Sequence, residues 1–209
     1  MSISRQRFDQ ARQLWGSYSS WAIWRTINVE QKPKADIGHL TVLDPDDNPS
    51  LLDQLKPDVV MLGLNAASRP IGSEPWSNFH DPRPMATDFK IRFAFEGTPY
   101  WGAYMTDVLV GLHETDSQKV AAYINANRGD VARQIGRLEQ ELHDIGAANP
   151  LLIAFGADAH RTLRDHLGSK YELVKVPHYA HRINKESYRA AVIDALAKRA
   201  NRTQAENGR

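Results

Sequence analysis

Two short segments carry the side chains best suited to chemistry. The first, Gly63-Leu-Asn-Ala-Ala-Ser-Arg69, combines a glycine and small residues with an amide, so its backbone can approach a ligand closely. In this segment Asn65 could hold a water molecule and a substrate group together. The second, Val176-Pro-His-Tyr-Ala-His-Arg182, places two imidazoles and a guanidinium just before a predicted helix. His178 could donate a hydrogen bond to a developing anion there, because the start of a helix favours negative charge.

Each segment also has a purely structural interpretation. The first can be a tight exit from a strand, and it lacks the spacing of the phosphate-binding GxxxxGK[ST] and dinucleotide-binding GxGxxG motifs. In the second, His178 and His181 can cap the helix and pack at the surface. The sequence places no third histidine or carboxylate near these two histidines that would complete a metal site, so we expect neither a metal nor another cofactor.

The composition excludes several classes of chemistry. The chain of 209 residues contains no cysteine, which rules out disulfides, thiolate zinc sites, cysteine-ligated iron–sulfur clusters and a cysteine nucleophile. It also lacks a GxSxG elbow, which disfavours acyl transfer through a serine. The formal net charge of +1 does not by itself indicate a nucleic-acid partner, although a local basic patch is compatible with it.

Strands and helices alternate along the predicted chain. Apolar runs ending in glycine, at Asp58–Gly63 and Leu151–Gly156, predict two strands buried on both faces. Further strands are predicted at Ala103–Leu109, Tyr171–Val176 and, in an irregular region, Leu40–Leu43. Helices are predicted at 4–14, 87–95, twice between 110 and 146, at 157–167, and from an N-cap at Asn184 to about residue 200. Such alternation predicts a parallel sheet with helices on both faces.

These elements predict a single domain over residues 1–209, with an N-terminal helix and irregular extension (1–57), an α/β core (58–200) and a flexible tail (201–209). The aromatic cluster from Trp15 to Trp24 is expected to pack in the core rather than to hold a ligand. Met1 to Leu14 is too polar for a signal peptide, and no apolar run approaches the ~20 residues that cross a bilayer. We therefore expect a cytoplasmic protein without a membrane partner, and a monomer.

Ligands of parallel α/β sheets bind beyond the carboxyl ends of the strands, which selects three loops: Leu64–Arg69, the residues at and after Asp107, and Pro177–Ile183. A buried strand ending in Gly-Leu-Asn, an aromatic-bearing loop, a strand ending near Thr-Asp, and a last strand ending in Pro-His follow one another in the chain. In this order the motifs resemble those of the uracil-DNA glycosylase superfamily, over roughly two-thirds of the chain from Asp58 to Lys198.

The resemblance implies a three-layer α/β/α sandwich around a four-stranded parallel sheet. It also implies hydrolysis of the N-glycosidic bond of a deaminated or damaged base flipped out of single- or double-stranded DNA. Asn65 matches the residue that positions the attacking water, and His178 matches the residue that contacts the base carbonyl. By position, the implied base-binding residues are Gly63, Leu64, Ala66, Trp76, Phe79 and Asp107, where Trp76 and Phe79 are alternatives for stacking. Expected contacts to DNA are Ser68, Arg69, His181, Arg182 and Lys185.

The sequence also departs from the family pattern. Ala66 and Ala67 stand where the first motif usually continues with Pro and Gly or Ser, and His178-Tyr-Ala-His-Arg182 replaces His-Pro-Ser followed by a residue that wedges into the duplex. Asp107 stands where several members have asparagine. An ionised carboxylate only accepts hydrogen bonds, so it suits an exocyclic amino group or a ring N–H rather than a uracil carbonyl. Two alternatives remain: a non-catalytic nucleobase or nucleic-acid binding protein of the same fold, and a hydrolase of free nucleosides.

Overall fold

The computed structural model describes residues 3–25, 34, 36–66 and 74–207, with side chains described as far as Asn201. Its centre is a five-stranded mixed sheet in the order β1-β3-β2-β4-β5. The strands are β1 (Ser20–Trp21), β2 (Lys56–Asn65), β3 (Ala103–Leu109), β4 (Leu151–Phe155) and β5 (Leu173–Val176). All neighbouring pairs are parallel except β1 and β3, which are antiparallel.

The predicted sheet of four parallel strands is therefore wrong, because the sheet has five strands and is mixed, whereas the α/β class with helices around a central sheet is confirmed. The additional strand β1 contains only two residues, which pair with Tyr104 and Met105 of β3. Two residues are too few to show a hydrophobic period, so the sequence gives no sign of the strand. The surrounding aromatic cluster packs as expected, because Trp21 and Trp24 are buried. The N-terminal segment thus supplies part of the core.

The helices follow the predicted pattern with three differences, one of which is the short helix α2 that the sequence does not predict. They are α1 (Arg5–Trp15), the 3-10 helix η1 (Leu40–Leu43), α2 (Leu51–Gln54), α3 (Phe89–Phe95), α4 (Ser117–Ala126), α5 (Arg128–Asp144), α6 (Ala157–Leu167) and α7 (Lys185–Asn207). The strand predicted at Leu40–Leu43 is wrong, since this segment forms a tight turn in which the Asp44 N–H donates to the Thr41 carbonyl. The last helix continues to Asn207, beyond its predicted end near residue 200. None of the helices in the described ranges is long and apolar enough to cross a membrane.

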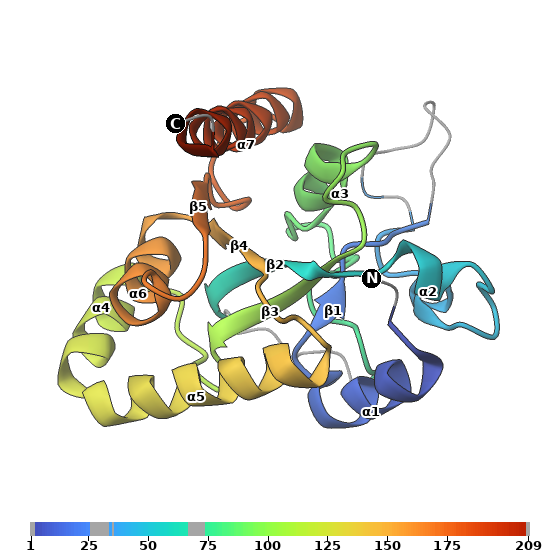
Figure 1. Ribbon diagram of the computed structural model, residues 1–209, viewed down its shortest axis with the longest axis horizontal. Coiled ribbons are helices and arrows are strands. Elements are labelled where there is room, and N and C mark those ends of the chain that lie inside the picture. The colour runs from blue at the N-terminus through green and yellow to red at the C-terminus, as the bar shows by residue number, and fades with distance from the viewer. Residues whose placement is uncertain (1–2, 26–33, 35, 67–73, 208–209) are drawn as a thin grey trace.

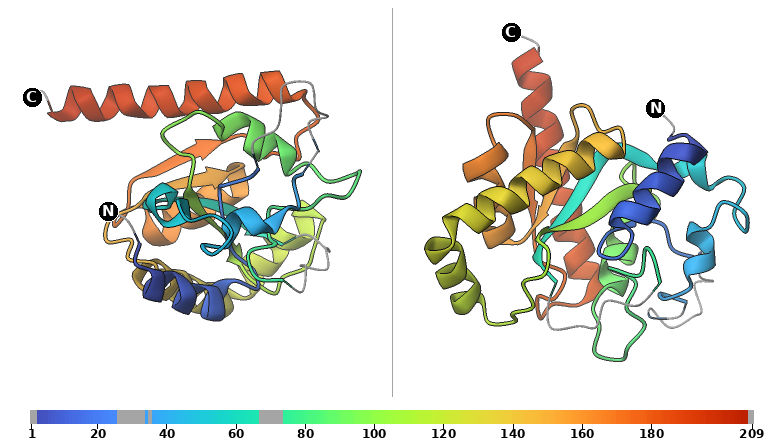
Figure 2. Two further views of the ribbon diagram at one scale, coloured as in Figure 1. Left: turned by 90° about the vertical axis from the view of Figure 1, so that its right-hand side faces the viewer. Right: turned by 90° about the horizontal axis from the view of Figure 1, so that it is seen from below.

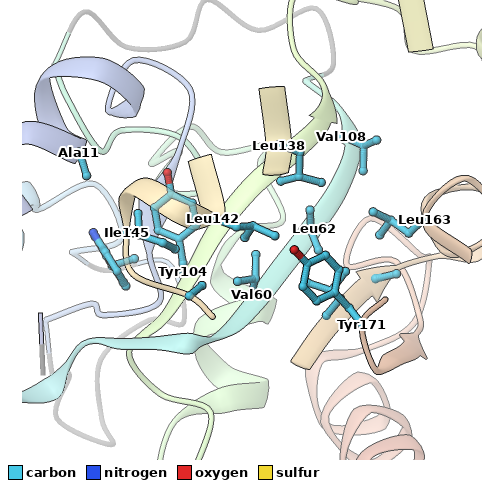
Figure 3. Close-up of a cluster of buried hydrophobic side chains, with 14 of the residues drawn as sticks. Ala11, Val60, Leu62, Tyr104, Val108, Leu138, Leu142, Ile145, Leu163 and Tyr171 are labelled. Carbon is cyan, nitrogen blue, oxygen red and sulfur yellow. The ribbon is translucent and has the colours of Figure 1, made fainter. Parts of the chain in front are cut away.

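Helices cover both faces of the sheet. The helices α1, α5 and α6 lie against one face and α3 and α7 against the other (Figures 1 and 2). Successive residues of β2 contribute to the two sides in alternation, as a strand requires: Val60 and Leu62 pack toward α5 and α6 (Figure 3), whereas Val59 and Met61 pack toward α3 and α7. By this alternation, Gly63 and Asn65 lie on the α3 and α7 side.

Two turns before α3 send neighbouring aromatic residues to opposite sides of the sheet. The Ser77 N–H donates to the Glu74 carbonyl and the His80 N–H to the Ser77 carbonyl, so Trp76 and Phe79 each occupy the third position of a turn. Both have positive φ, 68° for Trp76 and 64° for Phe79, a conformation that bulky residues rarely adopt. The Trp76 ring joins the core beneath α1 and α5, and the Phe79 ring joins the core beneath α3 and α7.

Candidate functional site

Asn65, the last residue of β2, has a fixed amide orientation. Its Nδ2 donates hydrogen bonds to the carbonyls of Leu112 (3.0 Å) and Glu114 (2.7 Å), in the loop that follows β3. Because both donated bonds come from the nitrogen, the amide oxygen Oδ1 is turned the other way and can only accept. The side chain therefore clamps the loop after β3 and also offers one acceptor to a water or ligand.

His178 follows β5 after a single proline, and its ring is held in one tautomer. The backbone N–H of Ala180 donates to Nδ1 at 3.1 Å, so in the neutral imidazole the proton resides on Nε2. The ring stacks on Tyr179 with centroids 4.5 Å apart and planes 21° apart. The backbone also comes close to Gly156, where a Cβ atom would lie 3.3 Å from the Cβ of His178 and φ is 90°. His178 is thus a positioned donor.

Asn65 and His178 line the same cavity, which has a volume of about 750 Å³. Its other walls come from Tyr179 and Ala180, from Glu114 and Thr115 after β3, and from Asp81 and residues 83–87 before α3. A volume of this size is typical of small-molecule pockets. The cavity lies where β2, β3 and β5 pass into loops, the end of a parallel sheet where ligands usually bind.

Glu114 brings negative charge to this cavity. Its Oε1 accepts hydrogen bonds from the N–H groups of Thr115 (2.8 Å) and Asp116 (2.9 Å), and these bonds lower the pKa of the carboxyl group. The carboxylate consequently stays ionised at neutral pH. The sequence offers no motif around Glu114, because the place of this residue at the cavity depends on how the β3–α4 loop folds onto Asn65.

Asp107 lies deeper, against Gly63 of the neighbouring strand. A Cβ atom on Gly63 would be 2.1 Å from Oδ1 of Asp107, so this carboxylate requires a glycine beside it. Asp107 is 3% exposed, and Asn78 donates to its Oδ2 at 3.1 Å. The same amide of Asn78 donates to the Tyr18 carbonyl and accepts the Phe79 N–H. Asn78 therefore fixes Asp107 and Phe79 together, a role that sequence reasoning missed.

The aromatic residues differ in their placement. Trp76 is 1% exposed and packs against the rings of Phe8, Trp21 and Tyr104, on the other side of the sheet from Asn65, which removes it as a candidate for base stacking. Phe79 is also 1% exposed and touches the ring of Tyr179, the aromatic residue that lines the cavity. A base could stack on Phe79 only after Tyr179 or its neighbours move.

The remaining predicted base contacts are small or turned away. Leu64 packs its side chain with the core beneath α5, on the face opposite Asn65. Ala66 is buried, at 6% exposure. Each of these two residues can therefore offer a base only its backbone groups, close to the start of the loop that follows β2.

The predicted DNA contacts are partly accounted for by internal interactions. Ser68 and Arg69 lie outside the described residues. His181 and Arg182 are exposed, and the His181 carbonyl accepts a hydrogen bond from Nζ of Lys90 at 2.7 Å. Lys185 forms an ion pair with Glu186 and lies 4.2 Å from the centre of the Phe93 ring, so its charge already interacts with groups of the protein itself. Arg83, whose side chain is about half exposed at the cavity, is an additional cation that the sequence did not single out.

A buried ionic network connects β3 to α5 on the side of the sheet that α1, α5 and α6 cover. Arg137 of α5 pairs with Glu141 and donates to the carbonyl of Asp107 at 2.8 Å. Glu141 is fully buried and accepts a hydrogen bond from the Tyr104 hydroxyl at 2.6 Å. Burial raises the pKa of Glu141 to about 7, despite the opposing effect of Arg137. The network joins α5 to the strand that carries Asp107.

Within the described ranges, no three His, Cys, Asp or Glu residues are grouped so that they could hold a metal ion. Comparison with models of known protein families finds no match, and no curated protein is significantly similar to the chain.

Proposed function

We propose that this protein is an N-glycosylase that hydrolyses the glycosidic bond of a deaminated or damaged base flipped out of DNA. One observation carries the proposal: Asn65 and His178, which come from separate strands, line one cavity with their hydrogen-bonding roles already fixed. The sequence predicts both residues as members of the site. Their chemistry suits the two halves of the reaction, the departure of the base and the capture of water.

Departure of the base requires a hydrogen-bond donor. As the bond between C1′ and the base nitrogen breaks, its electron pair moves onto the base, which becomes anionic. In its neutral form the His178 ring carries its proton on Nε2 and can donate it as a hydrogen bond to a base carbonyl. One well-placed donor in a water-excluded site contributes about 3 to 4 kcal/mol to such a transition state. The departing base then takes up a proton from solvent.

Capture of water requires an acceptor and favours negative charge. The oxygen of Asn65 can accept a hydrogen bond from a water molecule, which holds the water for addition to C1′. Asn65 is not a strong base, but a cation-like sugar carbon needs only a well-placed water. The ionised carboxylate of Glu114, on the wall of the same cavity, supplies a charge of the sign that stabilises this carbon. The added water loses its proton to solvent.

The proposal is tested by strand scission at abasic sites. Oligonucleotides carrying uracil, hypoxanthine or xanthine, single- and double-stranded, are incubated with wild type, Asn65→Ala and His178→Ala, and then treated with alkali. We expect wild type to generate alkali-labile sites and both variants to lose at least about 100-fold in rate, in line with the loss of one positioned group. His143→Ala is the matched control, because its imidazole is exposed on α5 and does not line the cavity.

The preferred base tests the role of Asp107. Uracil, hypoxanthine and xanthine each carry a ring N–H, so if the carboxylate of Asp107 reads that group, methylation of the ring nitrogen should slow the release of the preferred base. Folded wild-type protein without activity on any of these substrates would reject the proposal for these bases. Equal loss in His143→Ala and His178→Ala would reject the specific role of His178.

A second candidate, a non-catalytic binding protein of the same architecture, is favoured by the contacts of Asn65. Both N–H groups of its amide hold the loop after β3, a structural task that needs no chemistry. This candidate predicts affinity for DNA that falls with salt, without release of a base. The scission assay and a salt titration of binding together separate the two functions.

A further inference from the structure

The most exposed large apolar side chain among the described residues lies at the mouth of the cavity. Met85 is 91% exposed and lines the cavity together with Arg83 and Pro84. Single apolar residues on a surface are common and need no special explanation. The position of Met85 is nevertheless unusual, because it stands at the tip of a tight turn that lines the same cavity as Asn65 and His178.

The turn that presents Met85 is held at several points. The Ala86 N–H donates to the Arg83 carbonyl at 3.0 Å, which closes a turn with Pro84 and Met85 at its centre. Proline at the second position of a turn restricts φ, so the backbone at the tip has few alternatives. In Figure 2 the segment leading into α3 projects from the body of the molecule.

The base of the turn is fixed to a buried carboxylate. The Asp81 N–H donates to Oδ2 of Asp88, which is fully buried at the start of α3, and the Asp81 carboxylate pairs with the side chain of Arg83. On the other side, Lys90 of α3 donates to the His181 carbonyl. These bonds hold the Met85 turn and the His178 loop in a fixed relation to one another through α3.

We propose that Met85 is the wedge that enters a DNA duplex and fills the space left by the flipped nucleotide; this inference rests on the proposed glycosylase function. Flipping leaves a gap in the base stack, and proteins that unstack base pairs commonly insert an apolar side chain such as Phe, Leu, Ile or Met. The loop of His178, where the family resemblance implies a wedge residue, contains Tyr179, Ala180 and His181 instead. Of these, Tyr179 is buried, and the methyl side chain of Ala180 is too short to enter a base stack. The Met85 turn supplies an exposed apolar side chain from a different part of the chain.

A wedge acts only where a duplex must be opened, so the test compares strands of one sequence in single- and double-stranded form. Single-turnover rates of base release are measured for wild type, Met85→Ala, Met85→Leu and Leu14→Ala on the base that wild type prefers. Leu14 is the matched control, because it is an exposed apolar residue, 48% exposed, on α1. We expect Met85→Ala to lose roughly tenfold or more on duplex and less than about twofold on single strands, with Met85→Leu and Leu14→Ala close to wild type.

A binding measurement keeps this inference separate from the proposed function. A duplex containing a stable abasic analogue offers the gap without requiring chemistry, and a neighbouring 2-aminopurine reports on unstacking. Wild type should bind this duplex more tightly than the intact duplex, and Met85→Ala should lose that preference and the fluorescence change. If wild type releases bases but Met85→Ala affects both strand forms equally, or neither, the wedge is refuted and the glycosylase stands. If wild type neither releases a base nor prefers the abasic duplex, both proposals fail.

Discussion

The side-chain amide of Asn78 donates a hydrogen bond to Oδ2 of Asp107 at 3.1 Å, within the buried interior beneath the turn that carries Phe79. The same Nδ2 donates to the Tyr18 carbonyl at 2.7 Å, and Oδ1 accepts the Phe79 N–H at 3.1 Å. One side chain thus connects the N-terminal segment, the turn before α3 and the strand that carries Asp107.

Asn78→Ala should therefore destabilise the protein and loosen Asp107. The substitution removes one hydrogen bond from a buried carboxylate and one from each of two backbone groups, which costs on the order of 1 to 3 kcal/mol of unfolding free energy. Chemical denaturation measures the loss. Asn127→Ala is the control, because Asn127 also donates to a backbone carbonyl but is exposed, and its loss should stay within about 0.5 kcal/mol. Similar losses in both variants would contradict a special role for Asn78.

Gly63→Ala tests the close contact between β2 and Asp107. The added methyl group would lie 2.1 Å from Oδ1 of Asp107, so the carboxylate or the strand must move, at a cost of about 1 to 3 kcal/mol. Gly136→Ala, in the middle of α5 with no atom within 4 Å of the added group, should instead stabilise the protein by about 0.5 to 1 kcal/mol. Thermal unfolding of the two variants should thus shift in opposite directions. Equal shifts would mean that the contact does not limit residue 63.

Glu141→Gln should flatten the dependence of stability on pH. Burial raises the pKa of Glu141 from its ordinary 4.5 to about 7 in the folded protein. Between these values the folded state keeps a proton that the unfolded state has lost, so the contribution of Glu141 is fully present below pH 4.5 and is lost as the pH rises through 7. The loss amounts to up to about 3 kcal/mol. Glutamine cannot titrate, and it can still accept from the Tyr104 hydroxyl.

The measurement is the unfolding free energy of wild type and variant from pH 4.5 to pH 8. Glu139→Gln, on the same helix with its ion pair to Lys170, is the control and should follow wild type. Burial lowers the pKa of His80 to about 4, which contributes a slope of the opposite sign that is common to all three proteins and cancels in their differences. A variant curve parallel to wild type would show that Glu141 is not the buried acid that titrates here.

Glu114→Gln separates the charge at the cavity from its hydrogen bonds. Glutamine can still accept from the Thr115 and Asp116 N–H groups, so the loop should keep its conformation while the carboxylate charge is removed. If the charge stabilises a cation-like sugar carbon, the rate of base release should fall by about tenfold or more, with little change in DNA affinity. An unchanged single-turnover rate would assign Glu114 a structural role only.

The sequence predicts the elements that have uniform local patterns. β2 and β4 are continuous apolar runs, and α5 repeats its apolar residues with helical spacing, so each pattern reports its structure directly. β1 has no such pattern because it contains only two residues and depends on pairing with β3. The segment Leu40–Leu43 contains residues typical of strands, but without a neighbouring strand it forms a 3-10 turn.

The candidate site was predictable only in its two main residues. Asn65 and His178 stand directly at or after strands, and the carboxyl ends of parallel strands share one edge of the sheet. Asn78, Tyr179 and Glu114 could not be found in this way, because their roles arise from contacts between distant segments. The difference between Trp76 and Phe79 depends on two turns with positive φ at bulky residues, which local sequence preferences disfavour.

The most direct test of the glycosylase function is the appearance of the free base itself. Purified wild type, Asn65→Ala and His178→Ala are incubated with DNA containing hypoxanthine, xanthine or uracil, and the released base is quantified by mass spectrometry alongside the abasic strand. The glycosylase proposal predicts base and abasic strand in equal amounts from wild type, and about 100-fold less from either variant while each remains folded. Folded wild-type protein that binds these DNAs but releases no base would contradict it.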